Sequence, residues 1–284
     1  LDECNIVGVI TAPDVFNISY SQDKVTNILH ADFTTFCKRQ SLPYEIIEKG
    51  MHGAELFEKV KVWQPDAFFV VGWYHMIPPK WLKFCKAYGL HASLLPDYSG
   101  GAPLVWAIIN GEKKTGITLF EIDDGVDSGP IVAQSEEVIF EDDTISTLYG
   151  RIEEKGINLL KAFIPRLASG RNRLICQDES KRRTFPQRTP QDGLINFDWS
   201  THKIYNFIRA QTKPYPGAFL INKNSDQKIT VWSSRVHIIN HKIKPGSLIE
   251  HKGDWGITSS DGLIVPLKVN FMGVDVDFKL EYFR

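Results

Sequence analysis

Two loops of the 284-residue chain carry side chains that can move protons, and the first of them contains a histidine. Residues 89–103 begin as an apolar, strand-like run that holds His91, and the run breaks at Leu95-Pro96 into a loop rich in glycine and proline. A histidine on an apolar strand is most often a core residue with satisfied hydrogen bonds. The long loop favours a ligand site instead, because ligands of open α/β sheets bind at the carboxyl ends of strands.

The second loop is acidic and follows the strand-like run 116–122. It reads Asp-Asp-Gly-Val-Asp-Ser-Gly over residues 123–129, and its third carboxylate is Asp127. If both loops leave the carboxyl ends of strands in one sheet, Asp127 meets His91. A carboxylate beside an imidazole fixes its tautomer and favours its protonated form, which suits proton transfer in amine chemistry. A simple turn is the alternative interpretation of this loop.

The elements that must position these loops alternate between strands and helices. Apolar, β-branched runs predict strands at 5–10, 44–47, 67–72, 89–93, 116–122 and 131–138. Helix-compatible segments lie at 22–40, 79–86 and 103–110, and a long amphipathic helix is expected from Asp143-Thr144 to Ala168. Apolar strands that alternate with helices predict an α/β fold with a doubly wound parallel sheet.

The composition of the chain changes after Gly170. Six Arg or Lys residues lie between 171 and 188, and they form either a solvated linker or a set of cations that meets substrate phosphates. A helix is expected around 200–212, followed by short alternating runs at 228–239, 247–251, 256–259 and 263–270. This pattern predicts a small antiparallel β domain. We therefore predict domains at 1–170 and 193–284, joined by a linker at 171–192.

Composition and charge narrow the class of protein. Apolar residues make up 43% of the chain, charged residues 24%, and the net charge is −1, which indicates a packed globular protein rather than one built around nucleic acid. The sequence contains no run of ~18 apolar residues, so no membrane helix is expected. The first residues lack the layout of a signal peptide. We expect a cytoplasmic protein with neither a membrane nor a nucleic-acid partner.

Several common catalytic signatures are missing from the sequence. The four cysteines form no CxxC pair and there is no HExxH motif, so neither a disulfide framework nor a metal site is expected. GxGxxG, GxxxxGK[ST] and GxSxG are also missing, so nothing indicates a dinucleotide site, nucleotide hydrolysis or a serine hydrolase. Function must be inferred from the two loops, since an α/β fold hosts many activities.

Five motifs follow one another in register between residues 65 and 135. They read HASLLP, YSGGAP, WAIING, TGIT and DDGVDSG, and begin at His91, Tyr98, Trp106, Thr115 and Asp123. This ordered set closely resembles the folate-dependent formyltransferases, which include methionyl-tRNA formyltransferase and the sugar-nucleotide N-formyltransferases. The resemblance implies transfer of a formyl group from N10-formyltetrahydrofolate, a co-substrate, to a primary amine, with no metal.

Three segments extend the resemblance into the C-terminal part. They read RTPQDG from Arg188, PYPGAF from Pro214 and, most specifically, VWSSRVH over Val231–His237. They are similar to the formyltransferase domain of the bifunctional enzyme that acts on UDP-4-amino-4-deoxy-L-arabinose. The resemblance now covers most of the chain and implies a Rossmann-like domain followed by a smaller OB-like β domain.

The catalytic residues of the family can be placed on this chain only in part. By motif, His91 takes the position of the family's catalytic histidine and Asp127 that of its catalytic aspartate. The family's asparagine, two positions before the histidine, is Gly89 here. Loss of one oxyanion donor costs roughly 10²–10³ in rate where nothing replaces it. Ser99 is a second departure, because it stands where relatives usually carry an arginine.

The resemblance also implies which residues bind the donor and the acceptor. The folate pocket of the family maps to the loops 73–77 and 123–126, where backbone groups and apolar side chains contact the pterin. The implied folate-binding residues are Trp73, Met76, Ile77, Asp123, Gly125 and Val126. The implied substrate-binding residues are Ser93, Tyr98 and Arg188.

The acceptor that we expect from the sequence is the amine of a nucleotide-linked amino sugar, a small-molecule partner. One alternative is methionyl-tRNA formylation, although residues 193–284 are only mildly basic and tRNA binding calls for a basic surface. The other is a binding protein that keeps both pockets without catalysis, which Gly89 and Ser99 leave open. The sequence also leaves the oligomeric state open, with a homodimer as one option.

Overall fold

The structure of this protein is a computed structural model that describes residues 4–16, 25–27, 29–47, 50–170, 172–222 and 225–283. Its contacts divide the chain into two compact units. The first unit comprises Leu1–Ser99, Gly116–Glu136 and Glu153–Arg183, and the second comprises Gly100–Thr115, Glu137–Ile152 and Thr184–Arg284. Each unit draws on three separate stretches of the chain. The domain boundaries expected from the sequence, at 1–170, 171–192 and 193–284, stay a prediction.

The main sheet of the first unit has the strand order β5-β6-β8-β9. Its strands are β5 (Ala67–Val71), β6 (Lys86–His91), β8 (Lys114–Glu121) and β9 (Ile131–Val138). β5 and β6 are parallel, with Val71 opposite Leu90, whereas β6 and β8 are antiparallel, with His91 opposite Thr118. A second parallel pair joins β1 (Val9–Thr11) to β4 (Tyr44–Ile46). The fold is therefore mixed α/β with parallel strands at its core.

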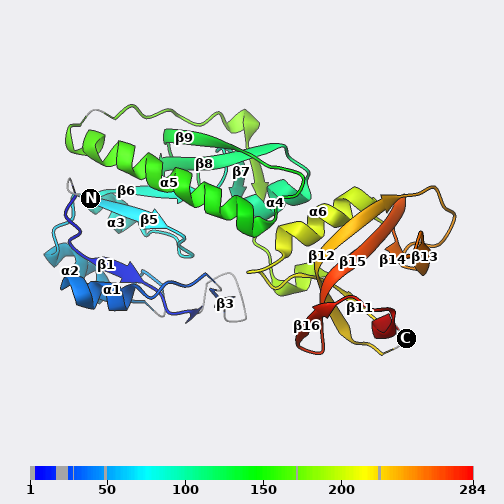
Figure 1. Ribbon diagram of the computed structural model, residues 1–284. Helices are drawn as coiled ribbons and strands as arrows, with labels where there is room; N and C mark the ends of the chain where they lie inside the picture. Colours follow the sequence, from blue (N-terminus) through cyan, green and yellow to red (C-terminus); the bar gives the residue numbers. More distant parts are fainter. Residues whose placement is uncertain are drawn as a thin grey trace. The chain divides into compact units, whose positions relative to one another are not determined.

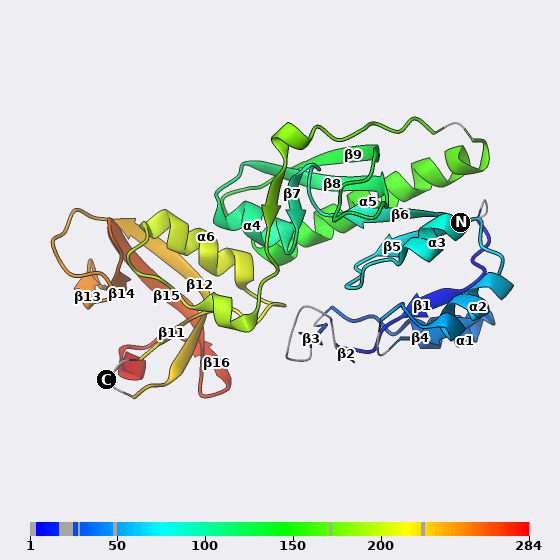
Figure 2. The ribbon, with the colours of Figure 1, turned by 180° about the vertical axis from the view of Figure 1, so that it is seen from behind.

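Helices pack against these strands and contribute part of the apolar core. They are α1 (Phe33–Gln40), α2 (Ala54–Val62), α3 (Pro79–Phe84) and α5 (Ile145–Ala168). On α5, Phe163 is buried with Tyr88 and Leu119, so this part of the helix packs on the main sheet (Figure 1). A second core surrounds Trp81, where α2, α3 and strands β1 and β5 meet (Figure 2).

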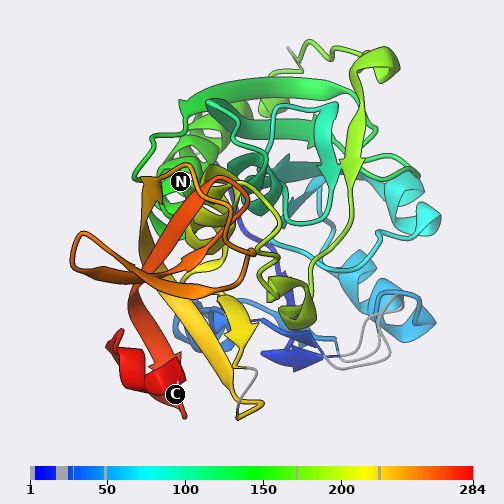
Figure 3. The same ribbon diagram turned by 90° about the vertical axis from the view of Figure 1, so that its right-hand side faces the viewer.

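The second unit is built on an antiparallel sheet with the order β11-β12-β15-β14-β13, and β16 pairs with β15. Its strands, coloured yellow to red in Figure 3, are β11 (Ala218–Ile221), β12 (Lys228–Ile238), β13 (Leu248–His251), β14 (Asp254–Thr258), β15 (Gly262–Phe271) and β16 (Val274–Asp277). α6 (Thr201–Gln211) contacts this sheet and also packs against α4 (Pro103–Ile109).

The remaining described elements are short. Strands β2 (Val15–Phe16) and β3 (Val25–Thr26) pair with each other, as do β7 (Asp97–Gly100) and β10 (Arg183–Phe185). Three 3-10 helices are η1 (Glu179–Lys181), η2 (Pro190–Gly193) and η3 (Leu280–Phe283). None of the helices in the part of the chain described above is both long enough and apolar enough to cross a membrane.

The predicted fold class, an α/β domain followed by a smaller β domain, is confirmed. The helix expected over 22–40 is wrong in its first half, because residues 25–26 form β3 and the helix begins only at Phe33; residues 22–24 and 28 lie outside the described residues. The physical reason is the Asp32 side chain, which accepts hydrogen bonds from the backbone N–H groups of Thr34 and Thr35 and so caps a helix that starts there. The sequence did not predict α2 or β7.

Candidate active site

His91 is the last residue of β6, and both of its ring nitrogens face oxygen atoms. Its Nε2 lies 2.8 Å from the backbone carbonyl oxygen of Tyr98, and its Nδ1 lies 3.5 Å from Oδ2 of Asp127. A carbonyl oxygen only accepts, so Nε2 carries the proton of that hydrogen bond. A neutral imidazole then presents its lone pair at Nδ1, on the side of the Asp127 carboxylate.

Asp127 therefore faces the one ring nitrogen of His91 that can take up a proton. A proton on Nδ1 replaces the repulsion between a lone pair and a carboxylate with an ion pair. The two side chains are largely buried, with exposed fractions of 11% for His91 and 20% for Asp127. Such shielding strengthens the attraction between opposite charges. The geometry supports an imidazole that accepts a proton and a carboxylate that stabilises the resulting cation.

The structure brings His91 and Asp127 together, but not for the reason that the sequence indicated. Because β8 is antiparallel to β6, its carboxyl end lies opposite the beginning of β6, where the Ile122 N–H donates to the Ala87 carbonyl. The acidic loop that follows must return along the sheet to reach His91. A run of apolar residues is the same for a parallel and an antiparallel strand, so the sequence could not show this reversal.

The loop after His91 is tied to β8 and β9 through Thr118. The Thr118 hydroxyl donates to the Ser93 carbonyl at 2.7 Å and accepts from the Leu95 N–H at 3.1 Å. Gln134 Nε2 donates both to this hydroxyl and to the Leu95 carbonyl. Ser93 itself is buried, and its hydroxyl donates to the Asp97 carbonyl at 2.7 Å. These contacts make Ser93 part of the loop framework, and its predicted role in substrate binding stays a prediction.

The volume beside Gly89 is filled by an apolar side chain. A Cβ atom on Gly89 would lie 2.8 Å from Cε1 of Phe120 and 3.3 Å from Cδ1 of Ile122. Phe120 is buried and packs with Leu95 and Ile131. The ring therefore occupies the space into which an asparagine at position 89 would extend. In this structure no side-chain amide stands two residues before His91, and a phenylalanine ring takes its place.

At Ser99 the structure supplies a cation from elsewhere in the sequence. Ser99 is buried and its hydroxyl donates to the Arg183 carbonyl at 3.4 Å. The Arg183 guanidinium lies 4.7 Å from the centre of the Tyr98 ring and forms an ion pair with Asp97 at 2.6 Å. A positive charge thus remains beside the loop although position 99 is not an arginine. Tyr98 is buried, and its role in substrate binding stays a prediction.

The acidic loop is shaped by its own first carboxylate. Asp123 Oδ1 accepts from the Gly125 N–H at 3.0 Å and from the Ser128 hydroxyl at 2.7 Å. A Cβ on Gly125 would lie 2.0 Å from that hydroxyl, so a larger residue there would displace the Ser128 side chain from Asp123. Val126 is left exposed at the tip. Of the residues predicted to bind folate, Asp123 and Gly125 form the loop and Val126 offers an apolar surface.

The loop after β5 supplies the other predicted folate-binding residues. Met76 is exposed, whereas Trp73 and Ile77 are partly buried against the core around Trp81. Within the described residues, Trp73 Nε1 and His75 Nε2 are buried polar atoms without a hydrogen-bond partner. Burial and the nearby His52 lower the pKa of His75. Buried polar atoms are normally paired, so these two nitrogens are exceptions to that rule in this loop.

Arg188 makes contacts within the second unit. Its Nη2 donates to the Asp192 carbonyl and to Oε1 of Gln211, both at 2.7 Å. The guanidinium lies 4.7 Å from the centre of the Trp106 ring, and burial lowers its pKa. These contacts tie α6 to the segment before it, and a role of Arg188 in substrate binding stays a prediction.

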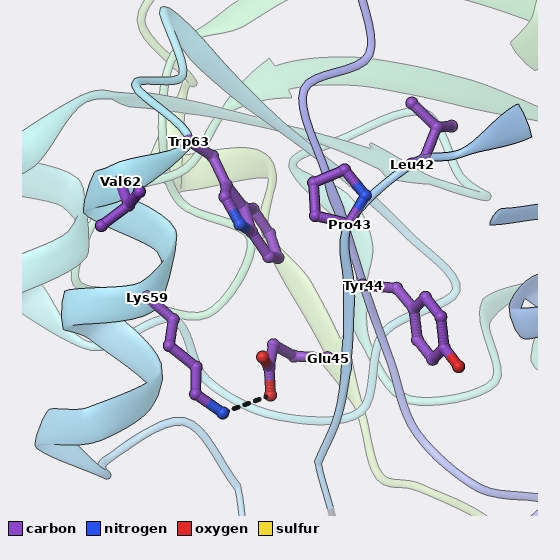
Figure 4. Close-up of a pocket in the computed structure, with 7 residues that line it drawn as sticks. All are labelled: Leu42, Pro43, Tyr44, Glu45, Lys59, Val62 and Trp63. Atoms are coloured by element: carbon purple, nitrogen blue, oxygen red, sulfur yellow. Dashed lines mark hydrogen bonds and ion pairs between the residues drawn. The ribbon is translucent and has the colours of Figure 1, made fainter. Parts of the chain in front are cut away.

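A cavity of about 450 Å³ lies in the first unit, away from the residues predicted to do chemistry. Figure 4 shows Trp63 and Pro43 on its wall, together with an ion pair between Lys59 and Glu45 at 3.1 Å. Its lining contains no residue of the predicted site. Over the described ranges, no cluster of three His, Cys, Asp or Glu side chains is arranged to hold a metal ion.

The pattern of residues in the first part of the chain is that of a known family. A family model described as formyl transferase matches residues 3–164, more than half of the chain. The chain belongs to the formyl transferase family. A model of the formyl transferase C-terminal domain matches residues 188–275. The chain therefore contains both domains of this family, in the order that the sequence motifs predict.

Solved structures share the fold of this formyl transferase. The match to HypX from Aquifex aeolicus in complex with tetrahydrofolic acid has a TM-score of 0.65 and 16% identity, and covers 95% of this chain but 45% of that one. The N-formyltransferase from Helicobacter canadensis, in complex with folinic acid and dTDP-3-aminofucose, gives 0.58 and 21% identity, with coverages of 92% and 99%. Methionyl-tRNA formyltransferase from Clostridium thermocellum gives 0.55 and 23%, with coverages of 92% and 100%. The chain thus spans under half the length of HypX, and these identities show the fold alone.

Several residues of the formyl transferase site were not found from the sequence. Thr118 belongs to the TGIT motif that begins at Thr115, so a signal existed, but its bonds to the loop after His91 could not be foreseen. Gln177 and Arg183 lie in the segment that the sequence presents as a linker. Their partners Asp127 and Tyr98 are 50 or more positions away along the chain. No local pattern marks such long-range contacts.

Proposed function

We propose that this formyl transferase moves a formyl group from N10-formyltetrahydrofolate to the primary amine of a nucleotide-linked amino sugar. The observation that carries the proposal is the distance of 3.5 Å between Nδ1 of His91 and Oδ2 of Asp127, in a chain of the formyl transferase family. An amine that forms an amide must lose a proton. A histidine paired with a carboxylate is suited to accept that proton.

The two side chains have different tasks. His91 accepts the amine proton at Nδ1, because its Nε2–H is already donated to the Tyr98 carbonyl. Asp127 faces Nδ1 and stabilises the imidazolium that results. When bound, N10-formyltetrahydrofolate supplies the formyl carbon, whose bond to N10 breaks as the new bond to the acceptor nitrogen forms. His91 then returns its proton to the leaving nitrogen, so the enzyme ends in its starting state.

The loops 73–77 and 123–127 would hold the folate donor. Met76 and Val126 expose apolar side chains that suit the flat pteridine ring. Further support comes from two proteins of the same fold, HypX and the Helicobacter canadensis enzyme, which were solved with tetrahydrofolic acid and folinic acid.

The choice of acceptor rests on the C-terminal resemblance. The VWSSRVH segment forms most of β12, where His237 and Arg235 both pair with Asp254. Its likeness to the enzyme that acts on UDP-4-amino-4-deoxy-L-arabinose supports an amino sugar. So does the Helicobacter canadensis structure with dTDP-3-aminofucose. Methionyl-tRNA is the competing acceptor, because the methionyl-tRNA enzyme has the same fold.

The test is a mass-spectrometric assay with N10-formyltetrahydrofolate and separate acceptors. UDP-4-amino-4-deoxy-L-arabinose, dTDP-3-aminofucose and methionyl-tRNA are each offered to the enzyme. We expect one formyl group on an amino sugar, a loss of at least ~10²-fold in rate in His91→Ala, and no change in the matched control His202→Ala, which alters an exposed histidine of α6.

The other outcomes identify the alternatives. Formylation of methionyl-tRNA alone, with salt-sensitive binding of tRNA, would replace the sugar by tRNA as the acceptor. Folate binding without any product would indicate a binding protein. Full activity of His91→Ala would show that the proposed proton transfer is wrong even if the acceptor is right.

A further inference from the structure

The segment 172–183 lies against the acidic loop that carries Asp127. Ile175 and Ile131 exchange two backbone hydrogen bonds, at 2.8 and 2.9 Å, in an isolated antiparallel bridge. This bridge places Gln177, two residues further on, beside the end of the acidic loop. The sequence presents the segment as a linker or as a set of cations for phosphates, and neither interpretation gives this glutamine a task.

The side chain of Gln177 makes two hydrogen bonds to the acidic loop. Its Nε2 donates to the carbonyl oxygen of Asp127 at 2.8 Å and to that of Gly129 at 2.7 Å. Asp127 has a φ of 51°, in the left-handed region that residues other than glycine rarely adopt. The amide of Gln177 therefore bonds the backbone where the chain adopts a costly conformation, at the residue whose carboxylate faces His91.

Arg182 determines which end of the Gln177 amide faces the loop. Its Nη2 donates to Oε1 of Gln177 at 3.0 Å, so the NH₂ group must point to the two carbonyls. Glu179 binds the same guanidinium and, followed by Asp127 and Asp123, raises the pKa of Arg182. The arginine therefore stays charged and cannot accept a hydrogen bond. With Arg182 in place, the reversed amide would put two donors face to face.

We propose that Gln177 is a positioning residue that holds Asp127 against His91, and that Arg182 fixes the orientation of its amide. The catalytic part of this inference rests on the proposed function, in which Asp127 stabilises the protonated His91. Two hydrogen bonds that flank Ser128 fix the backbone on both sides of it, and the backbone at Asp127 sets the direction of its carboxylate. A displacement of about 1 Å at such a group can cost roughly 10²-fold in rate.

The test replaces Gln177 by methionine, which keeps an unbranched, uncharged side chain and removes both donors. We expect hydrogen exchange of the backbone amides in residues 125–129 to become at least ~10-fold faster, and the kcat of sugar formylation to fall roughly 10-fold with the KM for the amino sugar unchanged. The matched control is Gln40→Met, which makes the same change at an exposed residue at the end of α1. If Gln177→Met does not fold, Gln177→Asn, which is too short to reach both carbonyls, takes its place.

A second comparison shows whether Gln177 acts through Asp127. In the Asp127→Asn background, Gln177→Met should cause little further loss of kcat, because the group that it positions is already altered. Full additivity of the two substitutions would overturn the inference, and so would unchanged exchange in residues 125–129. The exchange result needs no acceptor, so it stands even if no formylation is found and the proposed function fails.

Discussion

Replacing Gly89 by alanine tests whether Phe120 fills the volume beside it. A Cβ at position 89 would lie 2.8 and 3.0 Å from two atoms of the Phe120 ring and 3.3 Å from Ile122, whereas carbon atoms pack best at about 3.5–4.0 Å. Overpacking of a buried site costs about 1–3 kcal/mol. The smaller conformational freedom of alanine in the unfolded chain returns about 0.4–1 kcal/mol. We expect Gly89→Ala to lower the free energy of unfolding by about 1–2 kcal/mol.

Urea unfolding at pH 7 measures this change, and Phe120→Leu identifies its cause. The leucine removes the two ring atoms nearest to position 89, so Gly89→Ala should cost about 1 kcal/mol less in the Phe120→Leu background than in the original protein. Gly150→Ala is the matched control. Gly150 lies in α5 with nothing within 4 Å of an added Cβ, so there alanine should raise the free energy of unfolding by about 0.5–1 kcal/mol.

The same two positions, 89 and 120, carry a prediction about rate. With Phe120→Leu making room, Gly89→Asn places a side-chain amide two residues before His91, and such a donor near a formyl oxygen can raise the rate by up to ~10²-fold. In the presence of the phenylalanine ring, Gly89→Asn should lower both stability and activity. The reasoning is refuted if Gly89→Ala is as stable as the original protein, or if its cost is the same with leucine at position 120.

Two further predictions concern stability. Burial and the nearby His52 lower the pKa of His75 below its usual 6.5, so His75 takes up a proton more readily in the unfolded chain than in the folded protein. The free energy of unfolding should therefore fall as the pH drops below about 6.5. Urea unfolding measured from pH 7.5 to 5 should show a shallower fall in His75→Gln than in the original protein. Asp143 is buried and accepts two hydrogen bonds from the Arg151 guanidinium, at 2.8 and 2.7 Å. Arg151 keeps its ion pair with Glu137 when Asp143 is removed, so Asp143→Ala should lower the free energy of unfolding by about 1–3 kcal/mol; a loss below about 0.5 kcal/mol would show that the ion pair adds little.

The strands of the parallel core and the position of His91 could be predicted from local sequence. Ala67–Val71 is continuously apolar and its first four residues are partly buried, and such a run predicts a strand without knowledge of its partners. α2 was not predicted, although its sequence contains a helical signal. Glu55 and Lys59 are four residues apart and form an ion pair across one helical turn.

Other parts of the site depend on contacts that no local pattern encodes. The direction of β8 is one, since strands of either direction have the same apolar run. The position of the Phe120 ring beside Gly89 is another. The sequence shows that residue 89 has no side-chain amide, but not that Phe120 occupies the volume such an amide would need. The bonds of Gln177 to the acidic loop are a third, because they join residues 48 and 50 positions apart. These features arise only when separate segments pack together.

The packing of α4 on α6 has a consequence for chimeras built from this formyl transferase family member. Residues 193–284 resemble an independent module, but Ile204, Phe207 and Ile208 of α6 are buried and α6 packs against a helix from residues 103–109. In addition, Arg209 donates to the carbonyls of Phe140 and Asp143. A graft cut at residue 193 would therefore carry a mismatched apolar surface and an arginine without its acceptors. Recombination should instead exchange residues 100–115, 137–152 and 184–284 as one inherited set.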